Sequence, residues 1–198
     1  MIFSIIGWVA TVIYLANHIA LSVNRNYRGR LYFLLNLIGA SGLVVSSLVL
    51  QSWQAVAINT FWAVVSLLSL AGRHTGTDFK LSDKALTWPV WVLGAGGLVY
   101  AILAPNQGLA ALGWAATLLF CGAYLLFSAE TIRRRRFLAY NVAAAFGVAP
   151  ILYIDANWPA FGLEMAWGTI SLIGFVNAFR SAPETDDAKN PDDTASLD

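Results

Sequence analysis

Two apolar stretches of the chain carry polar and aromatic residues at the same spacing, at positions i, i+3 and i+7. They are Asn59, Trp62 and Ser66 in INTFWAVVS, and Glu164, Trp167 and Ser171 in GLEMAWGTIS. Residues at this spacing share one face of an α-helix, so each set forms a stripe. Indole rings offer flat faces to a ring or a cation, and an amide or a carboxylate can orient the bound group. The two stripes therefore predict a substrate-binding site.

Glu164 is the residue of this set that can carry a charge. An ionisable group in a transmembrane helix costs about 2.5–3.5 kcal/mol at mid-membrane on insertion scales, so it usually faces the bundle interior or a water-filled cavity. Glu164 lies about 9 Å into its apolar segment, at about 1.5 Å per residue. Without a basic partner this carboxyl group can take up a proton near neutral pH. We therefore expect binding or transport at the site to depend on pH.

The same residue types also have a purely structural interpretation. An asparagine in a membrane helix often only hydrogen-bonds a neighbouring helix, and an indole at mid-depth can simply fill core volume. We favour this packing role for Asn36 and Asn141, which lie beside small residues. For Asn59 and Glu164 both interpretations stay open.

No pattern in the sequence indicates an enzyme, a metal site or a cofactor. The sequence has no glycine-rich phosphate loop, no HExxH motif and no Ser-His-Asp arrangement. His18, near the end of an apolar segment, and His74, in a connection, are too differently placed for a haem or a metal. No apolar segment carries a lysine that could hold retinal. Cys121 is the single cysteine, which excludes an internal disulfide. We expect no catalytic residue and no cofactor.

The composition indicates an integral membrane protein. Of the 198 residues, 58% are hydrophobic and 12% are charged, and the mean hydropathy is +0.64. This is too apolar for a soluble domain of such a length. A helix needs about 20 apolar residues to cross a bilayer core of about 30 Å. Seven segments come close to this length: 3–22, 31–50, 53–72, 86–104, 108–128, 137–154 and 158–179.

The basic residues predict the orientation in the membrane. All 12 Lys and Arg residues lie in the connections 23–30, 73–85 and 129–136 or in the C-terminal tail, on one side of the membrane. By the positive-inside rule this side is cytoplasmic, so the N-terminus is outside and the C-terminus inside. We expect the protein in a bacterial inner membrane. The four arginines of the third connection are an ordinary topology signal that can contact lipid headgroups, and we expect no nucleic-acid binding.

An internal repeat links the two polar stripes. GWVAT at 7–11 recurs as GWAAT at 113–117, an offset of 113 − 7 = 106, which becomes 105 after the first basic connection. Residues matched at the second offset are Asn36 with Asn141, Trp53 with Trp158, Asn59 with Glu164, Trp62 with Trp167 and Ser66 with Ser171. The two stripes are thus equivalent positions of one duplicated unit.

The repeat divides the chain into four parts. Residues 1–73 form a first three-helix repeat, 74–107 a cytoplasmic loop and a linker helix, 108–180 a second three-helix repeat, and 181–198 a disordered acidic cytoplasmic tail. Because the linker helix crosses the membrane once, both repeats enter it in the same direction, around an axis along the membrane normal. The predicted fold is an all-α membrane protein of seven transmembrane helices in a 3+1+3 order.

This arrangement resembles the SWEET sugar transporters, their half-size SemiSWEET relatives and the wider PQ-loop (MtN3) superfamily, over residues 1 to about 180. The resemblance implies a transporter built of two parallel triple-helix bundles. The Pro-Gln pair that names the PQ-loop proteins is missing, and segments 3–22 and 108–128 lack the prolines that are thought to act as hinges in sugar-carrying SWEETs. The unit also resembles a bacterial family of small three-helix membrane proteins with a GWxxT start, from which no function carries over.

The predicted function is a small-solute membrane transporter with its binding site on the pseudo-twofold axis. The alternative is a non-transporting accessory or assembly subunit of a larger membrane complex, or a membrane receptor. The expected partners are the lipid bilayer and a small polar or heterocyclic solute, with a larger complex in the alternative. A water-accessible cavity between the repeats would favour the transporter, whereas repeats packed shut would favour the alternative.

Overall fold

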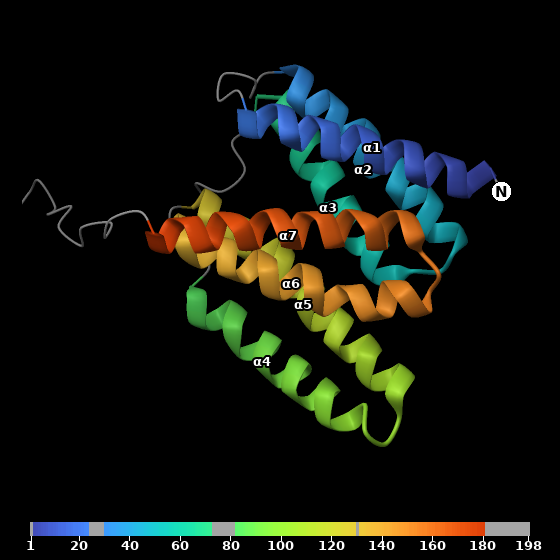
Figure 1. Cartoon of the computed structure of the whole chain (residues 1–198), viewed down its shortest axis with the longest axis vertical. Helices are drawn as coiled ribbons and strands as arrows, with labels where there is room; N and C mark the ends of the chain where they lie inside the picture. The colour runs from blue at the N-terminus through green and yellow to red at the C-terminus, as the bar shows by residue number, and fades with distance from the viewer. Residues whose placement is uncertain (1, 24–29, 73–81, 130, 181–198) are drawn as a thin grey trace, which may run out of the picture.

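The computed structural model describes residues 2–23, 30–72, 82–129 and 131–180. In this part of the chain it contains seven α-helices and no strand (Figure 1). The helices are α1 (Ile2–Val23), α2 (Arg30–Val49), α3 (Trp53–Leu70), α4 (Asp83–Tyr100), α5 (Pro105–Ser128), α6 (Arg134–Ile154) and α7 (Trp158–Arg180). The all-α prediction is confirmed. The predicted tail and the loop with His74 lie outside the described residues.

Three helices, α4, α5 and α6, begin three residues earlier than the hydrophobic pattern predicted. α4 begins at Asp83 instead of residue 86, because Ser82 caps it: the Ser82 hydroxyl accepts a hydrogen bond of 3.1 Å from the Ala85 amide. α5 begins at Pro105 instead of residue 108. Proline suits the first turn of a helix, where its missing N–H would have had no partner. α5 therefore does contain a proline, but at its start, where it cannot act as a mid-helix hinge.

Six of the seven helices are long and apolar enough to cross a membrane. They are α1, α2, α3, α5, α6 and α7. The integral membrane prediction is confirmed at this level. α4 has 18 residues, as many as α3, but it is not apolar enough to count as a membrane span. Its hydropathy is lowered by Asp83, Lys84, Pro89 and its glycines. Whether α4 also crosses the membrane stays a prediction.

The helices pack as two groups of three. Within each group the middle helix, α2 or α6, lies against both of the others, and α4 packs chiefly against α5 at the edge of the molecule (Figure 1). Between the groups, α1 packs on α7 and α3 packs on α5. In the repeat, α1 corresponds to α5 and α7 corresponds to α3. The two contacts are therefore equivalent, as expected for a pseudo-twofold relation between the groups.

The turns after α2 and α6 have the same backbone geometry. Gln51 and Ala156, which are 105 positions apart, have φ angles of 54° and 51°. Around each of them the backbone makes two closing hydrogen bonds, Gln51 to Leu48 and Ser52 to Ser47 in the first repeat. These bonds form a Schellman cap, which satisfies carbonyls left free at a helix end. Both connections therefore turn tightly with the same pattern of backbone hydrogen bonds.

The glycine of each GWxAT motif lies where three helices meet. A Cβ atom on Gly7 would approach the Ser46 hydroxyl of α2 to 2.6 Å and the Pro159 ring of α7 to 2.8 Å. The equivalent atom on Gly113 would lie 2.7 Å from Ile151 of α6 and 3.3 Å from Gln54 of α3. Small residues let membrane helices approach closely. The motif therefore fixes the contact between the repeats as well as the packing within each one.

Small residues also bring α4 against α5. A Cβ atom on Gly108 would overlap the backbone of Ala101, and one on Gly97 would lie 2.8 Å from the Gly108 carbonyl oxygen. Near the other end of α4, the buried Leu86 side chain occupies the space that Gly122 leaves open. These contacts form a tight helical hairpin that joins the two repeats.

We predict that Gly108→Ala loosens this hairpin. The added methyl group would meet backbone atoms that cannot move aside, and overpacking of this kind typically costs about 1–3 kcal/mol. The measurement is the thermal unfolding midpoint of the purified protein in detergent, which should fall by several degrees. Gly96→Ala, on the same hairpin, is the matched control because nothing lies within 4 Å of its Cβ position. Equal midpoints for the two variants would contradict the prediction.

Candidate binding site between the two repeats

The structure brings four of the six predicted site residues around one small cavity. The cavity has a volume of about 10 Å³, which is close to the space that one water molecule needs. Its lining residues come from α1, α3, α5 and α7, the helices through which the repeats meet. They are Tyr14, Ile58, Asn59, Trp62, Phe120, Leu163, Glu164 and Trp167. The repeats are thus nearly closed against each other in this conformation.

The eight lining residues form four equivalent pairs of the repeat. Tyr14 and Phe120 are 106 positions apart, the offset of the GWxAT motif. The other pairs, 105 positions apart, are Ile58 with Leu163, Asn59 with Glu164 and Trp62 with Trp167. A cavity lined by matching residues from both copies lies on the pseudo-twofold axis.

Three aromatic rings meet at nearly equal distances beside this cavity. The ring centroids of Trp62, Trp167 and Phe120 are 6.1–6.2 Å apart in all three combinations. Two further rings back the indoles in an equivalent way: Tyr124 lies 4.7 Å from Trp62, and His18 lies 4.1 Å from Trp167. Such centroid distances are typical of favourable aromatic contacts. The indoles are therefore held in place from behind.

The polar groups of the cavity are deeply buried, and two have no hydrogen-bond partner among the described residues. The side chains of Glu164 and Tyr14 are 4% and 3% exposed, and the Glu164 Oε2 and Tyr14 Oη atoms are the unpartnered ones. Asn59 instead donates to the Ala55 carbonyl of its own helix, over 2.9 Å. A buried polar group without a partner costs free energy and calls for an explanation.

The cavity lining contains no basic residue that could neutralise Glu164. Of the titratable groups on the neighbouring helices, Tyr14 on α1 lines the cavity with Glu164, and Cys121 follows the lining residue Phe120 on α5. His18 and Tyr124 contact the indoles. Any charge on Glu164 is therefore left to a bound cation or a proton to balance.

The two predicted serines lie elsewhere. Ser66 and Ser171 are buried, at 1% and 6% exposure, but neither lines the cavity. Each serine follows the lining tryptophan of its helix by four residues, about 6 Å of rise, so both lie one turn beyond the cavity. The lining residues Tyr14, Phe120, Ile58 and Leu163 were not among the predicted site residues. The repeat offset could have found Phe120, since it pairs with Tyr14.

The asparagines assigned to packing make hydrogen bonds between helices of the same repeat. Asn17 donates from Nδ2 to the Asn36 Oδ1 atom over 2.7 Å, which ties α1 to α2. Asn141 accepts a hydrogen bond of 3.1 Å from the Trp167 indole N–H and donates to Phe137 of its own helix. Asn141 therefore positions one wall of the cavity, a link that its sequence context did not reveal.

Among the described residues, four side-chain hydrogen bonds cross between the repeats near the ends where α2 and α6 turn into α3 and α7. Ser52 donates to Asp155 over 2.7 Å, and Asn157 donates to Ser47 over 2.9 Å. The other two run from Thr11 to the Pro159 carbonyl and from Gln54 to the Ala110 carbonyl. These bonds close the molecule on the side predicted to face outward.

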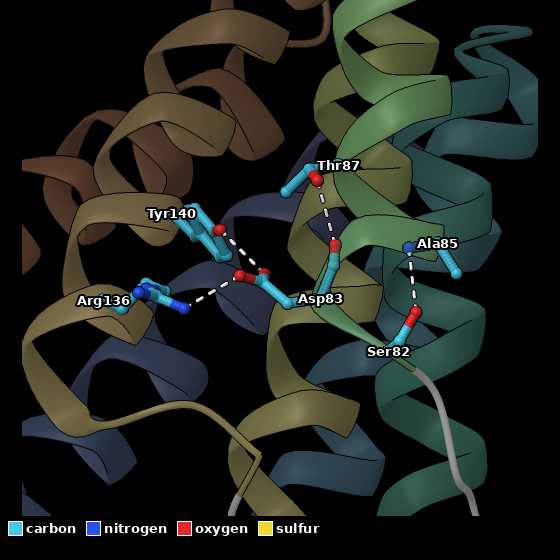
Figure 2. Close-up of polar contacts among 6 residues, drawn as sticks. All are labelled: Ser82, Asp83, Ala85, Thr87, Arg136 and Tyr140. Atoms are coloured by element: carbon cyan, nitrogen blue, oxygen red, sulfur yellow. Dashed lines mark hydrogen bonds and ion pairs between the residues drawn. The ribbon is translucent and has the colours of Figure 1, made fainter.

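A charged cluster at the opposite end ties α4 to α6 (Figure 2). Asp83 accepts 2.8 Å hydrogen bonds from the Arg136 guanidinium and from the Tyr140 hydroxyl. Arg136 is 57% exposed, so the ion pair itself adds little stability. The cluster nevertheless fixes the start of α4 against the second repeat.

Comparison with known proteins supports the duplicated membrane unit. The sequence model of one protein family matches residues 3–75 and residues 109–182, together more than half of the chain. The two matches begin 106 positions apart, the offset of the GWxAT motif. The fold and these matches define a helical membrane protein with two segments of one family. The chain belongs to this family of membrane proteins, whose function is unknown. No curated protein and no solved structure matches the chain.

We predict that the Asn141–Trp167 hydrogen bond stabilises the fold. Such bonds in membrane proteins average about 0.6 kcal/mol, with a maximum of about 1.7 kcal/mol. A double-mutant cycle with Asn141→Ala and Trp167→Phe, measured by unfolding in mixed micelles, should give a coupling energy in this range. The cycle Asn36→Ala with Trp167→Phe is the control, because Asn36 bonds Asn17 instead. A coupling near zero in the first cycle would show that the bond is not stabilising.

Proposed function

We propose that the protein is a small-solute membrane carrier whose site is the cavity between the two repeats. The observation that carries this proposal is the pairing of the lining: four equivalent residue pairs surround a buried carboxyl group that has no basic partner in the lining. In repeat-built transporters, substrate sites lie at the repeat interface near the middle of the membrane. The cavity lies at such an interface, between α1 and α7 on one side and α3 and α5 on the other.

The carrier would alternate by rocking one repeat against the other. The crossing bonds of Ser52 and Asn157 with the opposite repeat would break when the outer side opens. Because the repeats meet chiefly through two helix pairs, the interface is small enough to move.

The alternative, an accessory subunit or a receptor, has one specific observation in its favour. A cavity of about 10 Å³ holds no solute larger than about one water molecule. A protein that never opens would be expected to keep its repeats packed in this way. A carrier caught between its two open states would look the same, so movement of the repeats separates the two functions.

We predict that the cavity is reached from both sides of the membrane. In a Cys121→Ser background, Asn59→Cys should react with a membrane-impermeant thiol reagent added outside, and also with the reagent sealed inside oriented vesicles. Ala144→Cys is the control, because Ala144 is fully buried inside the second repeat and does not line the cavity. Labelling from one side only, or from neither, would favour the non-transporting alternative.

The carrier proposal includes α4 as a seventh membrane crossing, with the N-terminus outside and the C-terminus in the cytoplasm. This crossing would give the two repeats the same direction, as a pseudo-twofold axis along the membrane normal requires. The exposed tryptophans of α4, Trp88 and Trp91, at 70% and 71% exposure, support a lipid environment.

Reporter fusions test this topology. Alkaline phosphatase, which is active only outside the cytoplasm, should be active when it is fused after residue 104, in the connection between α4 and α5. It should be inactive when it is fused after residue 72, two residues beyond the end of α3, or at the C-terminus. A fusion after residue 104 that is as inactive as the one after residue 72 would show that α4 stays on the cytoplasmic side and that the repeats are not parallel.

A further inference from the structure

The cavity contains one acidic side chain and no basic one, and this imbalance indicates its ligand. Glu164 takes the place of Asn59 of the other repeat, so the symmetric site carries at most a single negative charge. Holding a lone carboxylate inside a membrane helix bundle is costly, because the charge has lost its hydration. A bound monovalent cation would offset that cost and would take the place of the proton that otherwise neutralises Glu164.

The walls of the cavity suit an organic cation better than a metal ion. Ca²⁺ and Mg²⁺ require about six or more oxygen ligands, and the lining offers only the oxygens of Tyr14, Asn59 and Glu164 besides backbone. Most of the surface is aromatic, from Trp62, Trp167 and Phe120. Aromatic faces attract ammonium groups, and tryptophan does so most strongly.

The number of free acceptors and the size of the cavity narrow the choice to a primary ammonium group. Such a group carries three N–H donors, and the unpartnered Glu164 Oε2 and Tyr14 Oη atoms are two acceptors placed to receive them. An –NH₃⁺ group is close to a water molecule in size and fits a space of about 10 Å³. A trimethylated ammonium group has no N–H donor and is far larger.

We infer that the substrate of this site carries a primary ammonium group, which is held by Glu164 and Tyr14 against the indoles of Trp62 and Trp167. This inference rests on the proposed carrier function, since it names the class of solute carried. The rest of the solute would extend into the space that opens when the repeats separate.

The test uses four probes on the purified protein in lipid nanodiscs. Propylammonium chloride is the ligand, 1-propanol is the neutral molecule of similar size, tetramethylammonium chloride is the quaternary cation, and sodium chloride controls for ionic strength. We expect propylammonium to raise the thermal unfolding midpoint in a saturable way, at a concentration at least about tenfold below that of any other probe.

Two substitutions connect the effect to the carboxylate. Glu164→Gln should abolish the stabilisation by propylammonium, and Glu164→Asp, which keeps the charge, should retain part of it even if the glutamine variant folds poorly. Thr169→Val is the matched control on α7, because the Thr169 hydroxyl is exposed and bonds only the Met165 carbonyl of its own helix. It should respond to propylammonium as the parent does.

The outcomes separate this inference from the carrier proposal. If 1-propanol stabilises the protein as well as propylammonium does, the site does not recognise a cation. If tetramethylammonium is the better ligand, the assignment to a primary ammonium is wrong. If no probe acts while Asn59→Cys is still labelled from both sides, the ammonium inference fails and the carrier proposal stands. If that labelling is also absent, both fail.

Discussion

The close contact of the two repeats is the constraint on which the rest of this structure depends. Glu164 and Tyr14 are buried only because α1 lies against α7 and α3 against α5. The contact is possible because Gly7 and Gly113 carry no side chain where the helices meet. Apolar side chains gain nothing by leaving lipid for one another, so close packing and hydrogen bonds must hold the repeats together. The four crossing hydrogen bonds and the cluster of rings supply both.

The duplication explains why a glutamate in one repeat, at the position of an asparagine in the other, changes the chemistry of the cavity so strongly. In a symmetric site, an amide on both sides would leave a neutral cavity with two equivalent walls. Replacing one amide by the carboxyl group of Glu164 breaks that symmetry without changing the volume much, because glutamate and asparagine differ by about one methylene group. His18 and Tyr124 differ in the same way behind the two indoles. The backbone thus stays symmetric, while the chemistry of the site does not.

Sequence reasoning predicted the helices and the pairing of the site because both follow from regular spacing. The repeat offset placed Asn59 opposite Glu164, and the helical period placed a tryptophan beside each. It did not include Tyr14 and Phe120 in the site, because an aromatic residue in an apolar helix can equally well face lipid. It also grouped residues seven positions apart, which share a helix face but differ in depth by about two turns. Depth depends on how the helices cross, and spacing along one helix does not specify it.

The unequal anchoring of the repeats bears on how such a protein could move. The second repeat is joined to α4 by small-residue packing along α5 and by the Asp83 cluster on α6 (Figure 2). The first repeat contacts the second mainly through two helix pairs and a few hydrogen bonds at one end. If the proposed rocking takes place, α4 to α7 would move as one body and α1 to α3 as the other. The wall bearing Glu164 would then belong to the larger body, and Asn59 and Trp62 to the smaller one.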